Sequence, residues 1–137
     1  MFKHTLRATL LAALFVAALS SAALASTGSV GITANPQAGN VLVDDHGMTL
    51  YRFTPDQPNT SLCYGGCAQD WPPVIVDAIP ATQDPALGAN LGIANRTDGS
   101  KQLTYLGAPL YYYVDDVQPG DLNGQGIGGV WFAITAS

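Results

Sequence analysis

The pattern of apolar and polar positions predicts short β-strands joined by turns. Apolar runs at 41–43 and 48–54 flank the polar turn Asp44-Asp45-His46-Gly47. Two apolar runs around an Asp/Gly-containing turn are typical of a β-hairpin. Successive strand residues face opposite sides, so Tyr51 and Phe53 should share one face of the second strand.

This pattern occurs twice, at an offset of 60 residues. A second hairpin is predicted at 91–105, followed by an apolar run at 109–114 and a last strand at 130–134. Phe53 recurs as the aromatic Tyr113. Eight positions are identical in both copies: Gly39, Gly47, Leu50, Tyr51, Asp56, Leu62, Gly66 and Trp71 recur as Gly99, Gly107, Leu110, Tyr111, Asp116, Leu122, Gly126 and Trp131. An internal repeat of this kind defines the architecture.

We therefore expect an all-β fold. It would consist of two tandem antiparallel β-units, each a hairpin plus a Trp-led strand, packed with pseudo-two-fold symmetry around one core. A lone hairpin is marginal in water, so neither copy could bury its apolar face alone. The predicted boundaries are an N-terminal arm at 26–38 and a single domain at 39–137, with copies at about 39–76 and 91–136 and a linker at 77–90. The arm would be either a leader strand or a loose segment.

The first 25 residues have the pattern of a secretory signal peptide. Lys3 and Arg7 precede an apolar run at 8–19, and Ala23-Leu24-Ala25 is a small-x-small cleavage site. The alternative is an uncleaved anchor helix, for which the apolar run is short. No later run is long and apolar enough to span a membrane after cleavage. We expect a secreted protein, periplasmic or extracellular.

Charge excludes one class of partner. After signal cleavage the chain carries three cations, Arg52, Arg96 and Lys101, against ten Asp and no Glu, which gives a net charge of −7. Such a chain repels polyphosphate, so nucleic-acid binding is excluded. The absence of Glu removes a good helix former, and the abundant Asp, Gly, Pro and Asn favour turns. Composition therefore agrees with an all-β fold.

Several motifs carry a resemblance to a known family. Tyr51-Arg52-Phe53-Thr54-Pro55-Asp56 and Tyr111-Tyr112-Tyr113-Val114-Asp115-Asp116 both fit a Tyr-x-aromatic-x-x-Asp pattern, and Gly128-Gly129-Val130-Trp131 closes the second copy. Cys63-Tyr64-Gly65-Gly66-Cys67 precedes Trp71-Pro72-Pro73. Over about 39–135 the chain resembles the bacterial secreted repeat of unknown function, predicted lipoproteins with that motif. It departs from many members because no lipidation cysteine follows the signal segment. The resemblance implies an exported two-copy module and no activity.

Cys63 and Cys67 are the only cysteines. In an oxidising compartment such a pair is expected to form a disulfide. A reactive dithiol is the first alternative, but the spacing is not Cys-x-x-Cys and no nearby cation would lower a thiol pKa. A soft-metal pair is the second. It would need two further ligands, which only His46, Met48 or carboxylates could supply.

His46 is the sole histidine after the signal segment. Catalysis of the Ser/His/Asp or Cys/His type would have to use it. Its place in a hairpin turn favours a solvent-exposed residue. The alternative is a copper or zinc ligand, together with Asp44, Asp45 or Met48.

Asp56 and Asp116 are the acids that recur in both copies. Paired carboxylates can perform acid/base chemistry or bind a hard cation. Recurrence favours an architectural role instead, in which each Asp accepts backbone N–H groups and fixes a turn. A further stretch, 121–126, resembles the first half of a calcium loop but lacks the Glu at position twelve, where Phe132 stands.

The aromatic residues allow two interpretations. Tyr51, Phe53, Trp71, Trp131 and 111–113 could form a stacking platform for a sugar or a flat cofactor. Aromatics that alternate on strands more often form a core.

The sequence as a whole predicts an exported cell-envelope binding or structural module without catalytic machinery and with no cofactor. Its partner is an unknown envelope component or small ligand. The alternative is a metal-binding or electron-transfer accessory protein that uses His46 and its neighbours.

Overall fold

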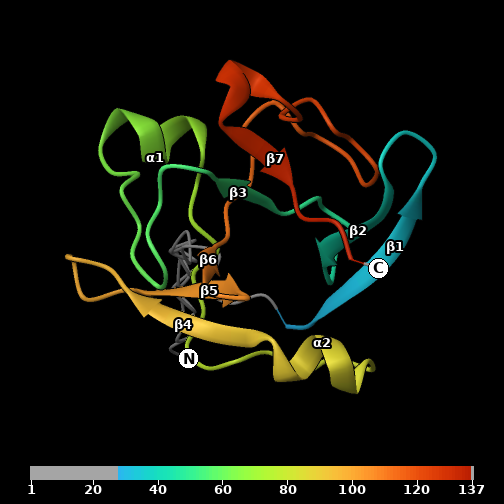
Figure 1. Cartoon of the computed structure of the whole chain (residues 1–137), viewed down its shortest axis with the longest axis horizontal. Coiled ribbons are helices and arrows are strands. Elements are labelled where there is room, and N and C mark those ends of the chain that lie inside the picture. Colours follow the sequence, from blue (N-terminus) through green and yellow to red (C-terminus); the bar gives the residue numbers. More distant parts are fainter. Residues whose placement is uncertain (1–27, 137) are drawn as a thin grey trace, which may run out of the picture.

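The computed structural model describes residues 28–136, so the signal segment predicted at 1–25 lies outside the described residues. The prediction of an all-β fold is confirmed, because the strands form three small antiparallel sheets with few helices between them (Figure 1). The strands are β1 (Val30–Asn35), β2 (Gly39–Asp44), β3 (Tyr51–Phe53), β4 (Leu91–Asn95), β5 (Lys101–Tyr105), β6 (Ala108–Pro109) and β7 (Trp131–Ala133). Two short α-helices, α1 (Gly66–Asp70) and α2 (Pro85–Ala89), lie at opposite ends of the molecule, and a 3₁₀ turn, η1 (Ile127–Gly129), precedes β7.

The strands pair in an order that the sequence did not indicate. The sheets are β1–β2, β3–β7 and β4–β5–β6. The second hairpin, β4–β5, forms as predicted. The first forms next to its turn, where Asp44 N–H donates to the Met48 carbonyl, Leu50 N–H donates to the Leu42 carbonyl, and Val43 bridges Thr49. In addition, β2 pairs along its length with β1. Of the two forms expected for the N-terminal arm, the structure has the leader strand, β1.

The Trp-led strand of each copy pairs with the other copy. β3 of the first copy pairs with β7 of the second, with Tyr51 opposite Ala133 and Phe53 opposite Trp131. In the reverse sense, Tyr111 bridges Pro73 of the first copy. We call the two segments that begin the Tyr-x-aromatic-x-x-Asp motif, 50–53 and 110–113, the motif strands. The expectation that each copy forms its own unit of hairpin plus Trp-led strand is wrong, because each motif strand pairs with the Trp-led segment of the other copy.

Between the copies, Tyr51 and Tyr111 join the two motif strands directly. Tyr51 N–H donates to the Tyr111 carbonyl at 2.8 Å, and Tyr111 N–H donates to the Tyr51 carbonyl at 2.9 Å. These two residues are fully buried. The motif that recurs in the sequence therefore forms the centre of the fold.

The backbone around each motif strand follows one scheme in both copies. Leu50 N–H donates to Leu42, Leu42 N–H to Ile134, and Ile134 N–H to Leu50. The same ring of three hydrogen bonds connects the second set: Leu110 donates to Leu103, Leu103 to Val74, and Val74 to Leu110. Leu42 and Leu103 therefore occupy equivalent places, as do Leu50 and Leu110. The pseudo-two-fold arrangement as a whole stays a prediction.

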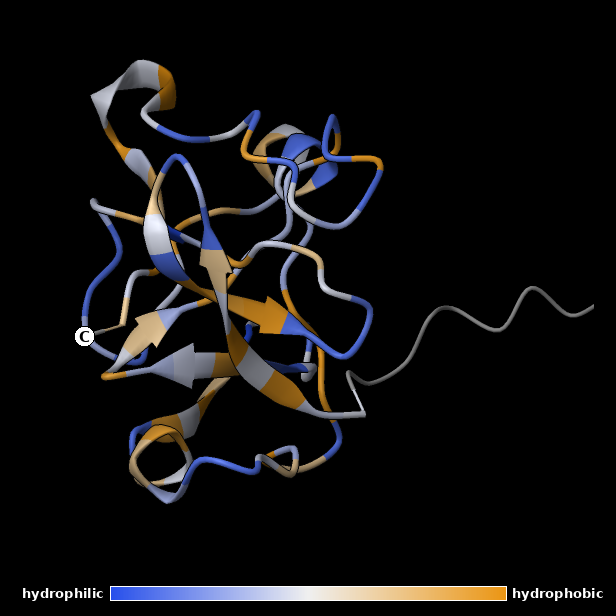
Figure 2. Cartoon of the chain, turned by 90° about the vertical axis from the view of Figure 1, so that its right-hand side faces the viewer, coloured by the Kyte–Doolittle hydropathy of each residue, from blue (hydrophilic) through white to orange (hydrophobic). Residues whose placement is uncertain are grey.

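Two clusters of buried residues lie on the two faces of the motif strands. Leu50 and Leu110 belong to an aliphatic cluster, and Tyr51 and Tyr111 belong to an aromatic one. Consecutive residues separate in this way because strand side chains alternate between faces. Apolar strands accordingly cross in the middle of the molecule, while the hydrophilic residues collect in loops (Figure 2).

Both helices lie between the predicted strands, α1 in the cysteine motif before Trp71 and α2 in the linker at 77–90. In the linker, Asp84 caps α2 by accepting the N–H groups of Ala86 and Leu87, Pro85 starts the helix, and Leu87 is buried. These are the usual signals of a helix start, but five residues are too few to show helical periodicity. Neither helix is long and apolar enough to cross a membrane, nor is any other helix within 28–136.

Candidate functional site

The recurring Tyr and Asp residues bond across the two copies. Tyr51 OH donates to Asp116 Oδ2 at 2.6 Å, and Tyr111 OH donates to Asp56 Oδ2 at 2.6 Å. Burial, followed by the hydrogen bond to Asp116, raises the pKa of Tyr51 far above its usual value. Burial and Asp56 do the same to the pKa of Tyr111. Both phenols are therefore neutral donors at physiological pH.

Each of these carboxylates also holds the turn that follows its own strand. Asp56 Oδ1 accepts the N–H of Leu62 at 2.7 Å, and Asp116 Oδ1 accepts the N–H of Asn123 at 2.9 Å. Asp116 is 8% exposed, whereas Asp56 is half-buried. Burial, partly offset by hydrogen bonds from Tyr111 and Leu62, raises the pKa of Asp56. Both oxygens of each carboxylate thus accept a hydrogen bond within the fold, one from a tyrosine hydroxyl and one from a backbone N–H.

The aromatic residues pack mostly on one another. The parallel rings of Trp71 and Trp131 stack with centroids 3.9 Å apart at 1°, Tyr113 stacks on Trp71 at 4.2 Å, and Phe53 stacks on Trp131 at 4.3 Å. Both tryptophans are buried, and only the two end rings are partly exposed. This arrangement favours the interpretation as a core over a ligand platform.

Arg96 forms a buried polar network that the sequence did not indicate. Its guanidinium donates to Ser61 Oγ at 3.0 Å, to Gln102 Oε1 at 2.8 Å and to the Cys63 carbonyl at 2.8 Å. It also lies 4.1 Å from the Tyr64 ring centroid. Ser61 in turn contacts the Tyr111 hydroxyl at 2.6 Å, so a chain of hydrogen bonds connects Arg96 to Asp56. One sequence holds no signal for this network, because its members are separated by up to 55 positions.

Cys63 and Cys67 form a disulfide, and no cysteine within 28–136 is free. Cys63 is buried in the aromatic cluster, and Cys67 is in the first turn of α1. The bond therefore attaches the short helix to the core next to Trp71.

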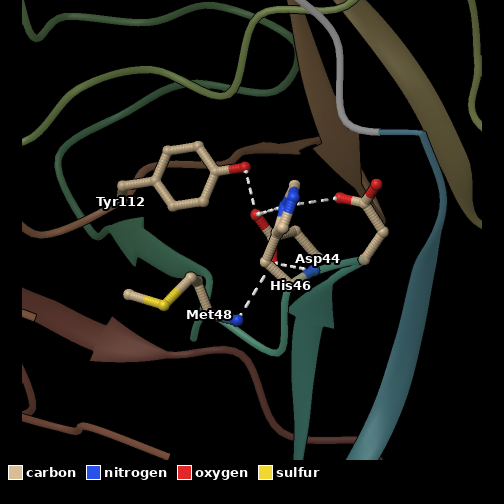
Figure 3. A network of polar contacts seen from close by, with 5 residues as sticks. Asp44, His46, Met48 and Tyr112 are labelled. Carbon is tan, nitrogen blue, oxygen red and sulfur yellow. Dashed lines mark hydrogen bonds and ion pairs between the residues drawn. The ribbon is translucent and has the colours of Figure 1, made fainter. Parts of the chain in front are cut away.

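The turn that contains His46 gathers two carboxylates. His46 Nδ1 lies 3.1 Å from Asp45 Oδ1 and 3.8 Å from Asp44 Oδ2, and the His46 side chain is 78% exposed. Asp44 is buried and accepts three hydrogen bonds, from the N–H groups of His46 and Met48 and from the hydroxyl of Tyr112 at 2.9 Å (Figure 3). The Met48 side chain extends away from the Asp44 carboxylate in the same view.

One ligand atom from each of Asp44, Asp45 and His46 lies within 4.8 Å of the others, a spacing that could hold a metal ion. Met48 does not join this group through its sulfur, because its side chain points away. Asp44 already has most of its acceptor capacity in use. The arrangement offers a metal three protein ligands, of which Asp45 and His46 are exposed and Asp44 is buried.

The stretch that resembles a calcium loop has another use. Asp121 Oδ2 accepts the N–H groups of Val117 and Gln118, and Asn123 Nδ2 donates to the Asp115 carbonyl. The Asp121 carboxylate and the Asn123 amide nitrogen therefore fix the loop before η1.

A pocket of about 360 Å³ lies beside Arg52. Its walls come from Arg52, Tyr105, Leu106, Ala108, Gln125 and residues 132–135. The Arg52 guanidinium carbon lies 5.4 Å from the centroid of the Phe132 ring. Arg52 is exposed and forms no ion pair with any residue in the described part of the chain. The pocket thus combines one cation that has no ion-pair partner within the described residues with walls of mixed polarity, apolar at Leu106, Phe132 and Ile134.

The comparisons with known proteins identify the repeat. The model of a protein family described as "secreted repeat of unknown function" matches the chain twice, at residues 32–75 and 92–135. No curated protein and no solved structure shows a significant match. The two matched segments are related by the offset of 60 and together cover most of the described residues.

Proposed function

We propose that this chain, which belongs to the family of secreted repeats of unknown function, is an exported binding module without catalytic machinery. The family description supports export to the periplasm or the cell exterior. It names no ligand and no reaction, so the proposal depends on how the chain uses its polar residues.

The observation that carries the proposal is that the two copies share a frame but present different residues in the turn before each Tyr motif. The frame consists of the Tyr–Asp pairs, the Trp pair and the two rings of backbone hydrogen bonds. In the first copy the turn at 44–48 presents Asp45 and His46 to solvent, whereas in the second the turn at 105–108 presents Leu106, which is 69% exposed. A rigid scaffold with variable loops is the usual design of a binding protein.

The groups that could support catalysis have structural partners. Asp56 and Asp116 each accept a tyrosine hydroxyl and a backbone N–H, and the cysteines form a disulfide. His46 lies next to two carboxylates, and within 28–136 it forms no hydrogen bond to a serine or threonine hydroxyl. These contacts support a binding function over a hydrolytic one.

The test is a ligand panel followed by mapping. Ligand-observed NMR with the mature protein would screen short carboxylates, sugars, amines and amino acids, and backbone amide shifts would locate each hit. We expect hits to shift amides of the turns at 44–48 or 105–108. A hit confined to the Trp71–Trp131 frame, or turnover of a panel compound, would contradict the proposal.

Metal binding is the second candidate, favoured by the convergence of Asp44, Asp45 and His46. We expect protein purified without chelator to take up Cu²⁺ or Zn²⁺, and His46→Ala or Asp45→Asn to lower the affinity. Asp98→Asn is the matched control, since Asp98 is an exposed turn aspartate far along the chain. Equal metal content in all variants would exclude a site at this turn.

A further inference from the structure

The two copies allow a comparison within one chain, because equivalent hydrogen bonds show which residues correspond. Leu42 and Leu103 hold the same place in their rings of three hydrogen bonds. Two residues later in each copy come Asp44 and Tyr105, each at the end of its strand. Asp44 and Tyr105 are therefore counterparts.

In one copy this position carries a carboxylate with a partner. Tyr112 OH donates to Asp44 Oδ2 at 2.9 Å, and the contact is partly buried (Figure 3). Tyr112 is the counterpart of Arg52 at the offset of 60. The frame therefore places a carboxylate beside residue 112 on this side of the molecule.

The equivalent position beside Arg52 has a stronger hydrogen-bond donor and no carboxylate. Arg52 replaces the tyrosine, and Tyr105 replaces the aspartate. Both line the pocket of about 360 Å³, and Arg52 has no carboxylate partner within the described residues. A guanidinium offers two parallel N–H donors in the geometry that a carboxylate accepts.

We propose that the pocket beside Arg52 binds the carboxylate of a small organic acid, with the apolar part of the ligand against Phe132 and Leu106. The inference rests on the proposed binding function and names its ligand class. The bound carboxylate would take the place that Asp44 fills in the other copy.

The charges of the chain restrict the ligand further. The mature chain has a net charge of −7, so a ligand with several negative charges is repelled as a whole. Arg52 is the one cation that lines this pocket. A monocarboxylate with an apolar body therefore fits better than a phosphate or a dicarboxylate.

The experiment titrates the mature protein with benzoate at low ionic strength and follows its amide shifts by NMR. Benzyl alcohol supplies the ring without the charge, and acetate supplies the charge without the ring. A short peptide with a C-terminal Phe tests whether the acid belongs to a chain end. We expect benzoate to shift amides of Leu106 and Phe132 and to bind more tightly than either fragment.

Variants separate the Arg52 contact from general attraction. Arg52→Gln should weaken benzoate binding about tenfold or more, the loss expected for a charge-assisted hydrogen bond. Arg52→Lys should give an intermediate affinity, because it keeps the positive charge but loses the two parallel N–H donors of the guanidinium. Lys101→Gln is the matched control: it removes the same charge at another exposed position, and it should bind like the wild type.

Two results would overturn the proposal. One is equal binding of benzoate and benzyl alcohol, and the other is an equal effect of Arg52→Gln and Lys101→Gln. If panel compounds shift only the turn at 44–48 and benzoate shifts nothing near Arg52, the carboxylate site is wrong while the binding module stands. Tighter binding of the peptide than of benzoate would support the site and assign the carboxylate to a chain end.

Discussion

The crossed Tyr–Asp bonds can be measured one copy at a time, since the chain contains the contact twice. The perturbations are Tyr51→Phe with Asp116→Ala, and Tyr111→Phe with Asp56→Ala, each as a double-mutant cycle. Tyr→Phe keeps the ring in the aromatic cluster and removes only the hydroxyl. The cycle then isolates the pairwise energy from the turn that each Asp also holds.

The structure predicts unequal couplings. A hydrogen bond to a charged group contributes roughly 1.5–3 kcal/mol to stability. Asp116 is 8% exposed, so water cannot replace the lost hydroxyl, and we expect about 3 kcal/mol for its pair with Tyr51. Asp56 is half-buried, and Tyr111 keeps a contact with Ser61 at 2.6 Å. We expect about 1.5 kcal/mol for that pair.

The assay is urea unfolding of the oxidised protein, followed by far-UV circular dichroism and extrapolated to water. Trp131→Ala calibrates the scale: it removes a buried ring from the stack and should cost about 3–5 kcal/mol, more than either Tyr→Phe variant. Couplings below about 0.5 kcal/mol in both cycles, the limit of simple additivity, would refute the role of these pairs. A larger coupling for Tyr111 and Asp56 would refute the argument from burial.

Three further predictions concern packing, pH and the disulfide. A Cβ on Gly124 would lie 2.8–2.9 Å from the Trp71 and Tyr51 rings, whereas one on Gly66 would meet nothing within 4 Å. In the same urea assay, Gly124→Ala should therefore lower the free energy of unfolding by about 1–3 kcal/mol, and Gly66→Ala should not. Burial raises the pKa of Asp56, so the folded state binds more protons than the unfolded state just above the ordinary pKa, and stability should fall as pH rises through that window. Asp56→Asn should remove this dependence of stability on pH. Asp98→Asn should not, because hydrogen bonds from Ser100 lower the pKa of Asp98, so its contribution to stability rises with pH. Urea unfolding across about pH 3–6 compares the variants. Mass spectrometry of unreduced, alkylated protein should detect no free thiol, and two alkylated cysteines in freshly exported material would contradict the bond between Cys63 and Cys67.

The polar network around Arg96 and the pocket beside Arg52 show where a single sequence is insufficient. Each depends on residues far apart in the chain, such as Ser61 with Arg96 or Arg52 with Tyr105. Spacing reports which residues share a face of one strand, but it carries no information about which segments meet. The equal spacing of the two copies even suggested self-contained units.

The sequence by itself determined the all-β class, the two copies and the residues at their centre. The alternation of side chains along a strand and the recurrence of Tyr, Asp and Trp are local properties, and they persist in any pairing of the strands. Only the tertiary structure decided that each copy completes the other, with Tyr51 bonded to Asp116 and Tyr111 to Asp56. Strand pairing depends on burial across the whole chain: in the observed pairing, the leucines of both copies share one aliphatic cluster and the tyrosines of both copies share one aromatic cluster.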